Sequence, residues 1–462
     1  MPAIITKDFR IQNANQFSES FGESADTYYL AIGRPQAFAD NQAFNDGTDT
    51  SPPTPVDSVG SVDYYVYDDL LSAKKISSSN VSAVIPRRNW TTGTTYDYYR
   101  HDYGEINSAG TVIAANSGAT TLHDATFYVM NSTFDVYKVI DNNGDSASTV
   151  EPTGNKSTSV FSTGDSYKWK YMYSLSASEQ ANFLSTDFMH VSTESTDYST
   201  TAGAIENAKV TAGGSGGTNG TYTNVDIRGD GSSGKATVVV GSNAVTSVTI
   251  TTAGSGYTFA SVLASDIGSV SGADIDFIIS PPGGHASDAV AELGGFFVMM
   301  NVDFATSESG EFNTSNDFRR IALLRNPTDS TTGSTATAST LDATKSITFS
   351  GTPGSFQADE KITQASSGAV GFVVDFNSTT KVLRYIQPQF TNQGVDSNGN
   401  LTAFSSTNTV TGATSSATGT PSSHDITPEL TADSGDILYI ENRKPISRAS
   451  DQTENVKLIV EF

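Results

Sequence analysis

Residues 236–250 have the sequence ATVVVGSNAVTSVTI. Two runs rich in β-branched residues flank the short polar segment 241–243, and this arrangement is typical of a β-hairpin. Farther towards the N-terminus, the apolar runs Phe127–Met130 and Asp135–Ile140 predict two strands of one β-layer. Strand signals of this kind recur along the chain, so the sequence predicts a mainly β fold.

Only short segments have the periodicity of a helix. Apolar residues recur at steps of three and four over residues 11–21, and the preceding Thr6 is a suitable N-cap residue. Ser176 and Glu179 have the spacing of a capping box, which predicts a second helix after Ser176. The leucine and alanine pattern over residues 64–75 predicts a third short helix. A few short helices are therefore expected beside the strands.

The chain is strongly acidic. It has 462 residues, of which 26 are Lys or Arg and 50 are Asp or Glu, so its formal net charge is −24. Nucleic-acid binding depends mainly on basic residues that replace counterions on phosphates, and a surface this acidic repels DNA and anionic membranes. We therefore expect neither nucleic acid nor a membrane as a partner. The aromatic content of 10% separates the chain from disordered sequences, which are poor in aromatic residues.

The chain contains no cysteine, which excludes disulfides, thiolate nucleophiles and cysteine-bound zinc. Its first residues lack the basic and then apolar order of a signal peptide. No apolar run approaches the roughly 20 residues that span a bilayer as a helix, and the best candidate, Phe296–Met300, has the length of a strand. We expect a protein that is made in the cytosol.

Composition divides the chain into a core and two inserts. Residues 204–282 (module 1) and 330–434 (module 2) are rich in Gly, Ser and Thr and contain few charged residues. The rest of the chain has more aromatic and charged residues. Long insertions at surface loops cost little loop-closure entropy. We therefore predict two small β-modules inserted into a discontinuous core, which consists of residues 1–203, 283–329 and 435–462.

Module 2 has two further features. Its first residues, 330–335, have the Ser, Thr and Gly composition of a flexible linker. Residues 362–371 (ITQASSGAVG) and 410–419 (VTGATSSATG) are similar at a constant offset of 48 residues. This similarity predicts a two-copy structural repeat within the module.

Three stretches resemble catalytic or metal-binding motifs. Residues 229–236 have Ala236 where a phosphate-binding P-loop needs Ser or Thr, and a β-run follows instead of a helix. Residues 213–217 fit a nucleophile elbow but lie in low-complexity Gly/Ser sequence. Residues 141–145 begin like a calcium loop, but Ser146 occupies the position of the required glycine. We interpret the first and third stretches as turns and the second as a chance match. Weak adventitious calcium binding is the alternative for the third stretch.

The sequence has no positive signal for an enzyme. The five histidines are scattered without the spacing of a zinc site. Paired carboxylates for glycoside hydrolysis cannot be recognised from the sequence, because that chemistry depends on their separation in space. We expect no catalytic residues, no cofactor, no bound metal and no small-molecule substrate.

One segment departs from the acidic background. In residues 83–90, AVIPRRNW, an apolar strand is interrupted at Pro86 and followed by Arg87, Arg88 and Trp90. Arg and Trp are over-represented at binding hot spots because they combine a large area with directed hydrogen bonds. These three residues are therefore interface candidates. The alternative is that Arg87 and Arg88 pair with acidic residues of their own subunit.

The segment 83–90 resembles part of the dimeric baseplate wedge protein of T-even-like contractile-tailed bacteriophages. Further similar segments lie along the chain in the same order as in that family: Ile4–Thr6 with Phe9–Arg10, Ile32–Arg34, Pro55–Val59, Gly164–Tyr171, Phe318–Pro327, Leu438–Ile446 and Asp451–Glu454. Each segment is short, and the resemblance depends on their colinearity from residue 4 to the C-terminus. It covers the predicted core and skips modules 1 and 2.

This resemblance implies a structural protein without catalytic activity. The family's fold consists of two β-sandwich domains with helical excursions, and its members pair as homodimers. They join other baseplate wedge proteins around the tail hub, in a baseplate whose rearrangement triggers tail contraction. The expected location is the tail baseplate of the virion, after assembly in the host cytoplasm. The full set of interface candidates is Arg87, Arg88, Trp90, Arg319, Arg320 and Arg443.

Two other functions stay open behind the structural role. A virion-borne carbohydrate-binding adhesin would suit the Thr-, Ser- and Gly-rich modules, with Tyr and Trp side chains stacking on sugar faces. A glycoside hydrolase would use carboxylates that the sequence does not reveal.

Overall fold

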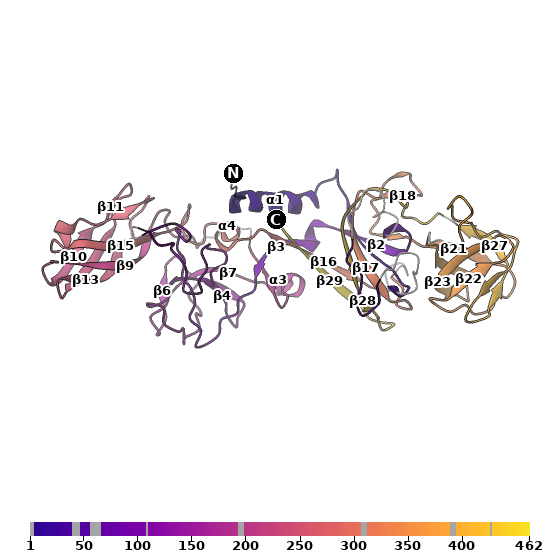
Figure 1. The fold of residues 1–462 in the computed structure, drawn as a ribbon, viewed down its shortest axis with the longest axis horizontal. Coiled ribbons are helices and arrows are strands. Elements are labelled where there is room, and N and C mark those ends of the chain that lie inside the picture. The colour runs from indigo at the N-terminus through magenta and orange to yellow at the C-terminus, as the bar shows by residue number, and fades with distance from the viewer. Residues whose placement is uncertain are drawn as a thin grey trace. The chain divides into compact units, whose positions relative to one another are not determined.

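The computed structural model describes residues 4–38, 47–55, 66–107, 110–192, 198–305, 312–388, 394–425 and 427–462. Strands dominate these residues, which confirms the mainly β fold class (Figure 1). The α-helices that lie entirely within these ranges are α1 (Lys7–Ser20), α3 (Ala177–Phe183) and α4 (Ala289–Leu293), and residues 66 and 67 are also helical. None of the helices in this described part is long and apolar enough to cross a membrane.

The chain divides into two compact units, each of which is discontinuous in sequence. Unit 1 consists of Met1–Gln16, Ser82–Met299 and Ile459–Phe462, and unit 2 consists of Phe17–Val81 and Met300–Leu458. Module 1 therefore belongs to unit 1 and module 2 to unit 2. The predicted division into a core and two inserts stays a prediction.

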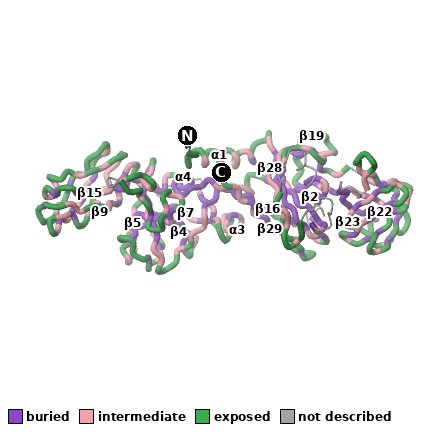
Figure 2. The backbone as a smooth tube through the Cα atoms, in the orientation of Figure 1, coloured by how far each residue is buried: buried purple, intermediate pink, exposed green. Residues whose placement is uncertain are grey.

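In unit 1, a four-stranded antiparallel sheet contains a large part of the aromatic core. Its order is β4-β5-β7-β6, formed by β4 (Tyr128–Met130), β5 (Asp135–Asp141), β6 (Phe161–Ser162) and β7 (Lys168–Ser174). Strands β4 and β5 are the two strands predicted from the apolar runs, and they pair with each other. Trp169 of β7 is fully buried and stacks on Tyr167, with ring centroids 5.4 Å apart. Buried residues line β4, β5 and β7 (Figure 2).

In unit 1, β3 (Val81–Pro86) pairs antiparallel with β8 (Phe188–His190). Two further strands are β16 (Phe297–Phe304) and β29 (Glu454–Glu461). The predicted capping box at α3 is confirmed. The Glu179 N–H donates to Ser176 Oγ at 3.3 Å, and the Ser176 N–H donates to the Glu179 carboxylate at 2.6 Å. The predicted first helix is confirmed as α1, where the Phe9 N–H donates to Thr6 Oγ1 at 3.3 Å.

Module 1 is built from antiparallel strands that pair with one another. They are β9 (Ile205–Ser215) with β15 (Ser271–Ile279), β10 (Gly220–Asp226) with β12 (Lys235–Gly241) and β13 (Ala244–Thr252), and β11 (Arg228–Gly229) with β14 (Ala260–Ser261). The predicted hairpin is confirmed as β12 and β13. Its turn residues Ser242 and Asn243 have φ values of 54° and 65°, the positive values that a type I′ turn requires. The P-loop-like stretch leads into strand β12, which confirms its interpretation as a turn.

In unit 2, a five-stranded antiparallel sheet has the order β20-β2-β1-β17-β28. Its strands are β1 (Tyr28–Gly33), β2 (Leu70–Ile76), β17 (Phe318–Arg325), β20 (Thr340–Asp342) and β28 (Asp436–Ile446). The predicted helix over residues 64–75 is wrong for residues 70–75, which form β2. A short buried apolar run has no periodicity that separates a strand from a helix, and pairing with β1 decides for the strand. Val66 and Tyr67 are helical, as predicted, and residues 64 and 65 lie outside the described residues.

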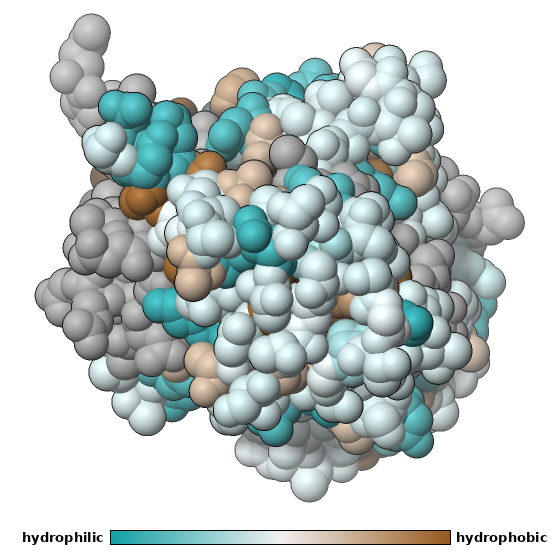
Figure 3. Space-filling model, turned by 90° about the vertical axis from the view of Figure 1, so that its right-hand side faces the viewer, coloured by the Kyte–Doolittle hydropathy of each residue, from teal (hydrophilic) through white to brown (hydrophobic). Residues whose placement is uncertain are grey.

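Module 2 contains a seven-stranded antiparallel sheet with the order β26-β25-β22-β23-β24-β21-β27. The strands are β21 (Lys345–Phe349), β22 (Lys361–Gln364), β23 (Ala369–Asn377), β24 (Val382–Ile386), β25 (Val410–Gly412), β26 (Thr418–Gly419) and β27 (Pro421–Asp425). Each copy of the predicted repeat forms a hairpin, β22 with β23 and β25 with β26. Figure 3 shows the side on which β22 and β27 are labelled in Figure 1, where hydrophilic and neutral residues predominate.

The flexible linker predicted at residues 330–335 is wrong. Strand β18 (Thr328–Asp329) pairs with β19 (Ser334–Thr335), so the stretch is the turn of a small hairpin. Gly333 supplies the positive φ of 66° that the turn needs, and its N–H donates to the Asp329 carbonyl at 2.8 Å. Composition alone does not predict this hairpin, because Ser, Thr and Gly are common in both linkers and tight turns.

Candidate functional site

The interface candidates Arg87, Arg88 and Trp90 follow strand β3 in unit 1. Backbone hydrogen bonds hold this segment after the strand ends. The Arg87 N–H donates to the Asp187 carbonyl at 2.7 Å, and the Trp90 N–H donates to the Met130 carbonyl at 2.9 Å. The local backbone therefore presents the three side chains in defined positions.

The two guanidinium groups are bound within unit 1 by carbonyl oxygens. Arg87 Nη1 donates to the Ser185 carbonyl at 2.7 Å, and Arg88 Nη2 donates to the His123 carbonyl at 3.2 Å. The Arg88 guanidinium also lies 4.5 Å from the centroid of the Tyr128 ring. The acidic partners of the alternative interpretation are not found among the described residues. Both side chains are half-buried, and their use by a partner stays a prediction.

Trp90 lies half-buried at the edge of the aromatic cluster of unit 1. Its indole N–H donates to Ser148 Oγ at 3.1 Å, and its ring packs against the cluster that contains Tyr96 and Trp169. Tryptophan suits interfaces because it combines an apolar body with one polar group. Here the polar group is already bonded within the chain, so a partner would use the exposed part of the ring.

Arg319 and Arg320 are neighbours in β17 of unit 2, so their side chains leave the sheet on opposite faces. Both are buried, with 6% and 5% of their surface exposed. Arg319 Nε and Nη2 each donate to an Asp49 carboxylate oxygen at 2.9 Å, a bidentate arrangement. Arg320 Nη1 donates to Asp69 Oδ1, also at 2.9 Å. Both arginines therefore hold parts of unit 2 in place, and their role at an interface is untested.

We expect the contact between Arg319 and Asp49 to weaken in acid. Hydrogen bonds from the Arg319 side chain hold the pKa of the Asp49 carboxyl below its ordinary value. Such a carboxyl stabilises the fold above its unfolded-state pKa of about 4, and this contribution is lost as the pH falls through the folded-state pKa. Hydrogen exchange of residues 47–55, corrected for the intrinsic rate, should show protection at about pH 6 that is lost below about pH 4.

The Arg319→Lys variant is the control for this experiment, because lysine cannot make the bidentate contact. Its residues 47–55 should be poorly protected at both pH values. Equal protection of the unaltered chain at both pH values would contradict the prediction.

Arg443 lies in β28, an edge strand of the five-stranded sheet among the described strands. Its side chain is 44% exposed, and its Nε lies 3.4 Å from Glu441 Oε1. Residues two apart in a strand share one face, so Glu441 and Arg443 project to the same side. Arg443 is therefore far more accessible to a partner than Arg319 or Arg320.

The six candidates fall into two sets, one in each unit.

Sequence reasoning missed another group of polar residues, the buried charges Lys138 and Glu292 of unit 1 and Asp69 of unit 2. The available signal was a lysine inside the apolar run Asp135–Ile140, because a lysine within a buried strand requires a partner. Nothing in the sequence points to the acidic partners.

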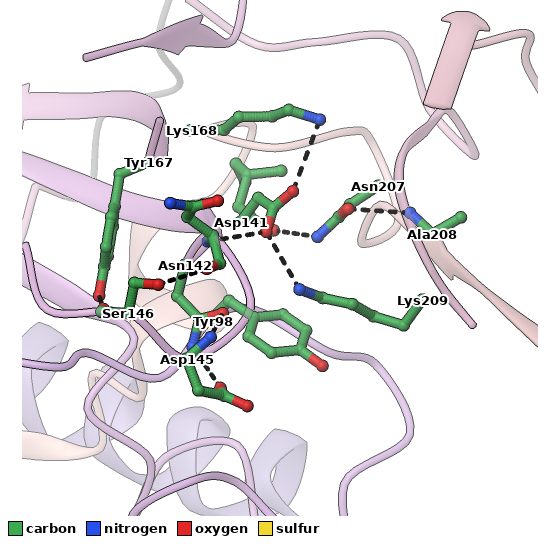
Figure 4. Close-up of polar contacts among 12 residues, drawn as sticks. Tyr98, Asp141, Asn142, Asp145, Ser146, Tyr167, Lys168, Asn207, Ala208 and Lys209 are labelled. Carbon is green, nitrogen blue, oxygen red and sulfur yellow. Dashed lines mark hydrogen bonds and ion pairs between the residues drawn. The ribbon is translucent and has the colours of Figure 1, made fainter. Parts of the chain in front are cut away.

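A polar cluster joins the beginning of module 1 to the end of β5 (Figure 4). The ammonium groups of Lys209 and Lys168 lie 3.1 and 3.6 Å from the Asp141 carboxylate. The Asn207 side chain donates to the Ile140 carbonyl at 2.8 Å. Strand β9 is thereby attached to β5, and the two lysines neutralise the Asp141 carboxylate.

The calcium-loop-like stretch 141–145 is a turn, as interpreted from the sequence. The Asn143 N–H donates to Asp141 Oδ1 at 3.1 Å, and the Asn142 amide donates to Asp145 Oδ1 at 2.7 Å. The turn's own donors and the two lysines thus occupy its carboxylates. In the ranges that the structure describes, no group of three or more His, Asp or Glu residues is arranged to hold a metal ion.

Comparisons with known proteins identify a matching family model and a relative of part of the chain. A family model described as Bacteriophage T4, Gp8 matches residues 3–147. The baseplate wedge protein gp8 of Enterobacteria phage T4 is 27% identical over 218 residues, which cover 41% of this chain and 60% of the relative. The matched range of the family model contains the segment 83–90 with Arg87, Arg88 and Trp90. Both comparisons therefore confirm that this chain resembles the baseplate wedge proteins of T-even-like phages.

Proposed function

We propose that this chain is a structural subunit of a phage tail baseplate wedge. In this role it assembles as a homodimer with other baseplate wedge proteins in the virion, and it takes part in the rearrangement that triggers tail contraction. The observation that carries the proposal is the match of residues 3–147 to the family model, together with similar segments in the same order up to the C-terminus. The aligned relative is a baseplate wedge protein, which supports a structural role over an enzymatic one.

The baseplate role is tested in the phage that encodes the chain. A nonsense mutation should give particles without functional contractile tails, and mass spectrometry should find the chain in the purified baseplate fraction of normal virions. Normal, infectious tails in the mutant would contradict the proposal.

The edge position of β28 among the described strands supports the dimer. An edge strand offers unpaired backbone N–H and C=O groups to another strand. If two copies of β28 pair antiparallel about Asn442, Glu441 of one copy lies opposite Arg443 of the other, and the reverse contact forms across the two-fold axis. The same pairing places Leu438, which is 43% exposed, opposite Ile446. The strand is therefore complementary to itself in charge and in apolar contacts.

Charge reversal tests this dimer interface. Light scattering after size exclusion should give the unaltered protein a mass of about twice the 48.6 kDa of one chain. Glu441→Arg and Arg443→Glu should each shift it towards monomer, because like charges then face each other at two symmetric positions. The double variant Glu441→Arg/Arg443→Glu restores opposite charges and should restore the dimer.

Two outcomes would count against this part of the proposal in different ways. A monomeric unaltered protein at micromolar concentration would overturn the homodimer itself. If the unaltered protein and both single variants are dimers, the homodimer proposal stands, but the edge of β28 is excluded as its interface.

A further inference from the structure

A cavity of about 620 Å³ lies in unit 1 beside the cluster of Figure 4. Module 1 contributes Glu206 of β9 and, around the end of β13, Ile250, Thr251 and Ala253. The rest of the lining consists of residues 158–160, Ser162, Lys168 and residues 199–201. Its volume is within the range of small-molecule binding sites. Because Lys168 and β9 are held by the contacts around Asp141, two walls of the cavity have defined positions.

Glu206 is the unexplained group in this cavity. Its Oε2 atom is buried and has no hydrogen-bond partner among the described residues. The buried Lys170 ammonium acts electrostatically on Glu206, but its hydrogen bond goes to the Ser157 carbonyl at 2.9 Å. Burial raises the pKa of Glu206, and the nearby lysines oppose this shift only in part. A buried polar atom without a partner costs about 1–3 kcal/mol. Because Oε2 itself is closed to solvent, a ligand in the cavity would reach this carboxylate at its other oxygen.

The rest of the lining consists mainly of hydroxyl groups, with a smaller apolar part. The hydroxyl-bearing residues are Thr158, Ser159, Ser162, Ser199, Thr200, Thr201 and Thr251. A hydroxyl both donates and accepts hydrogen bonds, whereas the Lys168 ammonium only donates and an ionised Glu206 only accepts. Val160, Ile250 and Ala253 add apolar surface. The lining therefore provides hydrogen-bond donors, acceptors and some apolar surface.

We propose that this cavity binds a neutral polyhydroxylated ligand of the size of a mono- or disaccharide, with neighbouring ligand hydroxyls donating to the Glu206 carboxylate. The Glu206 carboxylate would repel an anion, and the Lys168 ammonium in the lining would repel a cation. A sugar carries hydroxyls that donate to Glu206 and accept from Lys168, and its C–H faces suit the apolar wall. The inference is independent of the baseplate role.

The test uses the full chain with free glucose, galactose and N-acetylglucosamine in saturation-transfer NMR, and a glycan array for larger saccharides. We expect saturable binding of at least one saccharide, with a Kd on the order of 1 mM for a monosaccharide. Glu206→Gln should raise this Kd about tenfold or more, because the substitution removes a charge-assisted acceptor. The matched control Glu105→Gln, an exposed glutamate of the same unit, should leave binding unchanged.

The folding of the Glu206→Gln variant is checked separately by thermal unfolding. Its midpoint temperature should not fall, because the substitution removes a buried charge. Absence of binding by the unaltered chain in both assays would overturn the proposal. Saccharide binding that Glu206→Gln leaves unchanged would overturn it as well, because the binding would then occur elsewhere.

Discussion

The Glu292→Ala variant is expected to lose about 3–5 kcal/mol of the free energy of unfolding of unit 1, because it leaves the Lys138 ammonium buried without its counter-charge. Lys138 has no exposed surface, and Glu292 is 4% exposed. The two side chains form an ion pair in the interior. Burial lowers the pKa of Lys138, and the Glu292 carboxylate opposes that shift.

Glu292 also accepts backbone hydrogen bonds, and losing them adds to the loss of stability. Its carboxylate also accepts the backbone N–H groups of Ala286, Ser287 and Asp288 at 3.0, 2.9 and 3.2 Å. It therefore closes the turn that leads into the short helix α4. Removing it leaves these donors without their acceptor in a largely buried place, and each such group costs further free energy.

Tryptophan emission during urea unfolding measures this effect in unit 1, because both tryptophans of the chain, Trp90 and Trp169, lie in that unit. The double variant Lys138→Met/Glu292→Leu is the control. It removes both charges and should regain part of the lost stability, while the N–H groups stay unpaired. A loss below about 1 kcal/mol in Glu292→Ala would contradict the prediction.

The second large effect is expected in unit 2, where Asp69→Ala should lower the free energy of unfolding by about 3–5 kcal/mol. Asp69 is 2% exposed, and its carboxylate serves two buried arginines. Arg320 Nη1 lies 2.9 Å from Oδ1, and Arg34 Nη1 lies 3.5 Å from Oδ2. Because arginine stays protonated, the variant retains both positive charges in the interior with no opposing charge from this residue.

Hydrogen exchange of the peptides that cover β1 and β17 measures this loss within unit 2. Asp436→Ala provides the matched control in the same sheet, since Asp436 pairs with Arg325 at 2.6 Å but both side chains are largely exposed, at 57% and 40%. An exposed pair contributes about 0–1 kcal/mol, so the control should exchange almost as slowly as the unaltered chain. Equal effects of the two variants would show that burial of Asp69 is not the deciding factor.

Local features of the fold were predictable because neighbouring residues determine them. The hairpin of β12 and β13 depends on a Ser-Asn turn and its flanking β-branched residues, and the capping box of α3 depends on two residues three positions apart. The errors occurred where local signals are ambiguous. Residues 70–75 could form a helix or a strand until β1 supplied a partner, and residues 330–335 have a composition common to linkers and turns.

The interface candidates were chosen by residue type and by family resemblance, and the structure separates them by accessibility. Arg443 is exposed in an edge strand, whereas Arg319 and Arg320 are buried and bonded to Asp49 and Asp69. Residue type does not encode this difference, because accessibility depends on what the rest of the chain places around a side chain. All six remain predictions for the assembled baseplate.

The amino-acid sequence by itself determined the mainly β class, the acidic character, the short helices and the family resemblance, because each depends on composition or on patterns within a few residues. Only the tertiary structure decided which charges share the interior. Lys138 and Glu292 are 154 positions apart, and Asp69 and Arg320 are 251 apart. Strand pairing between distant segments brings such groups together, and no spacing along the chain specifies a separation in space.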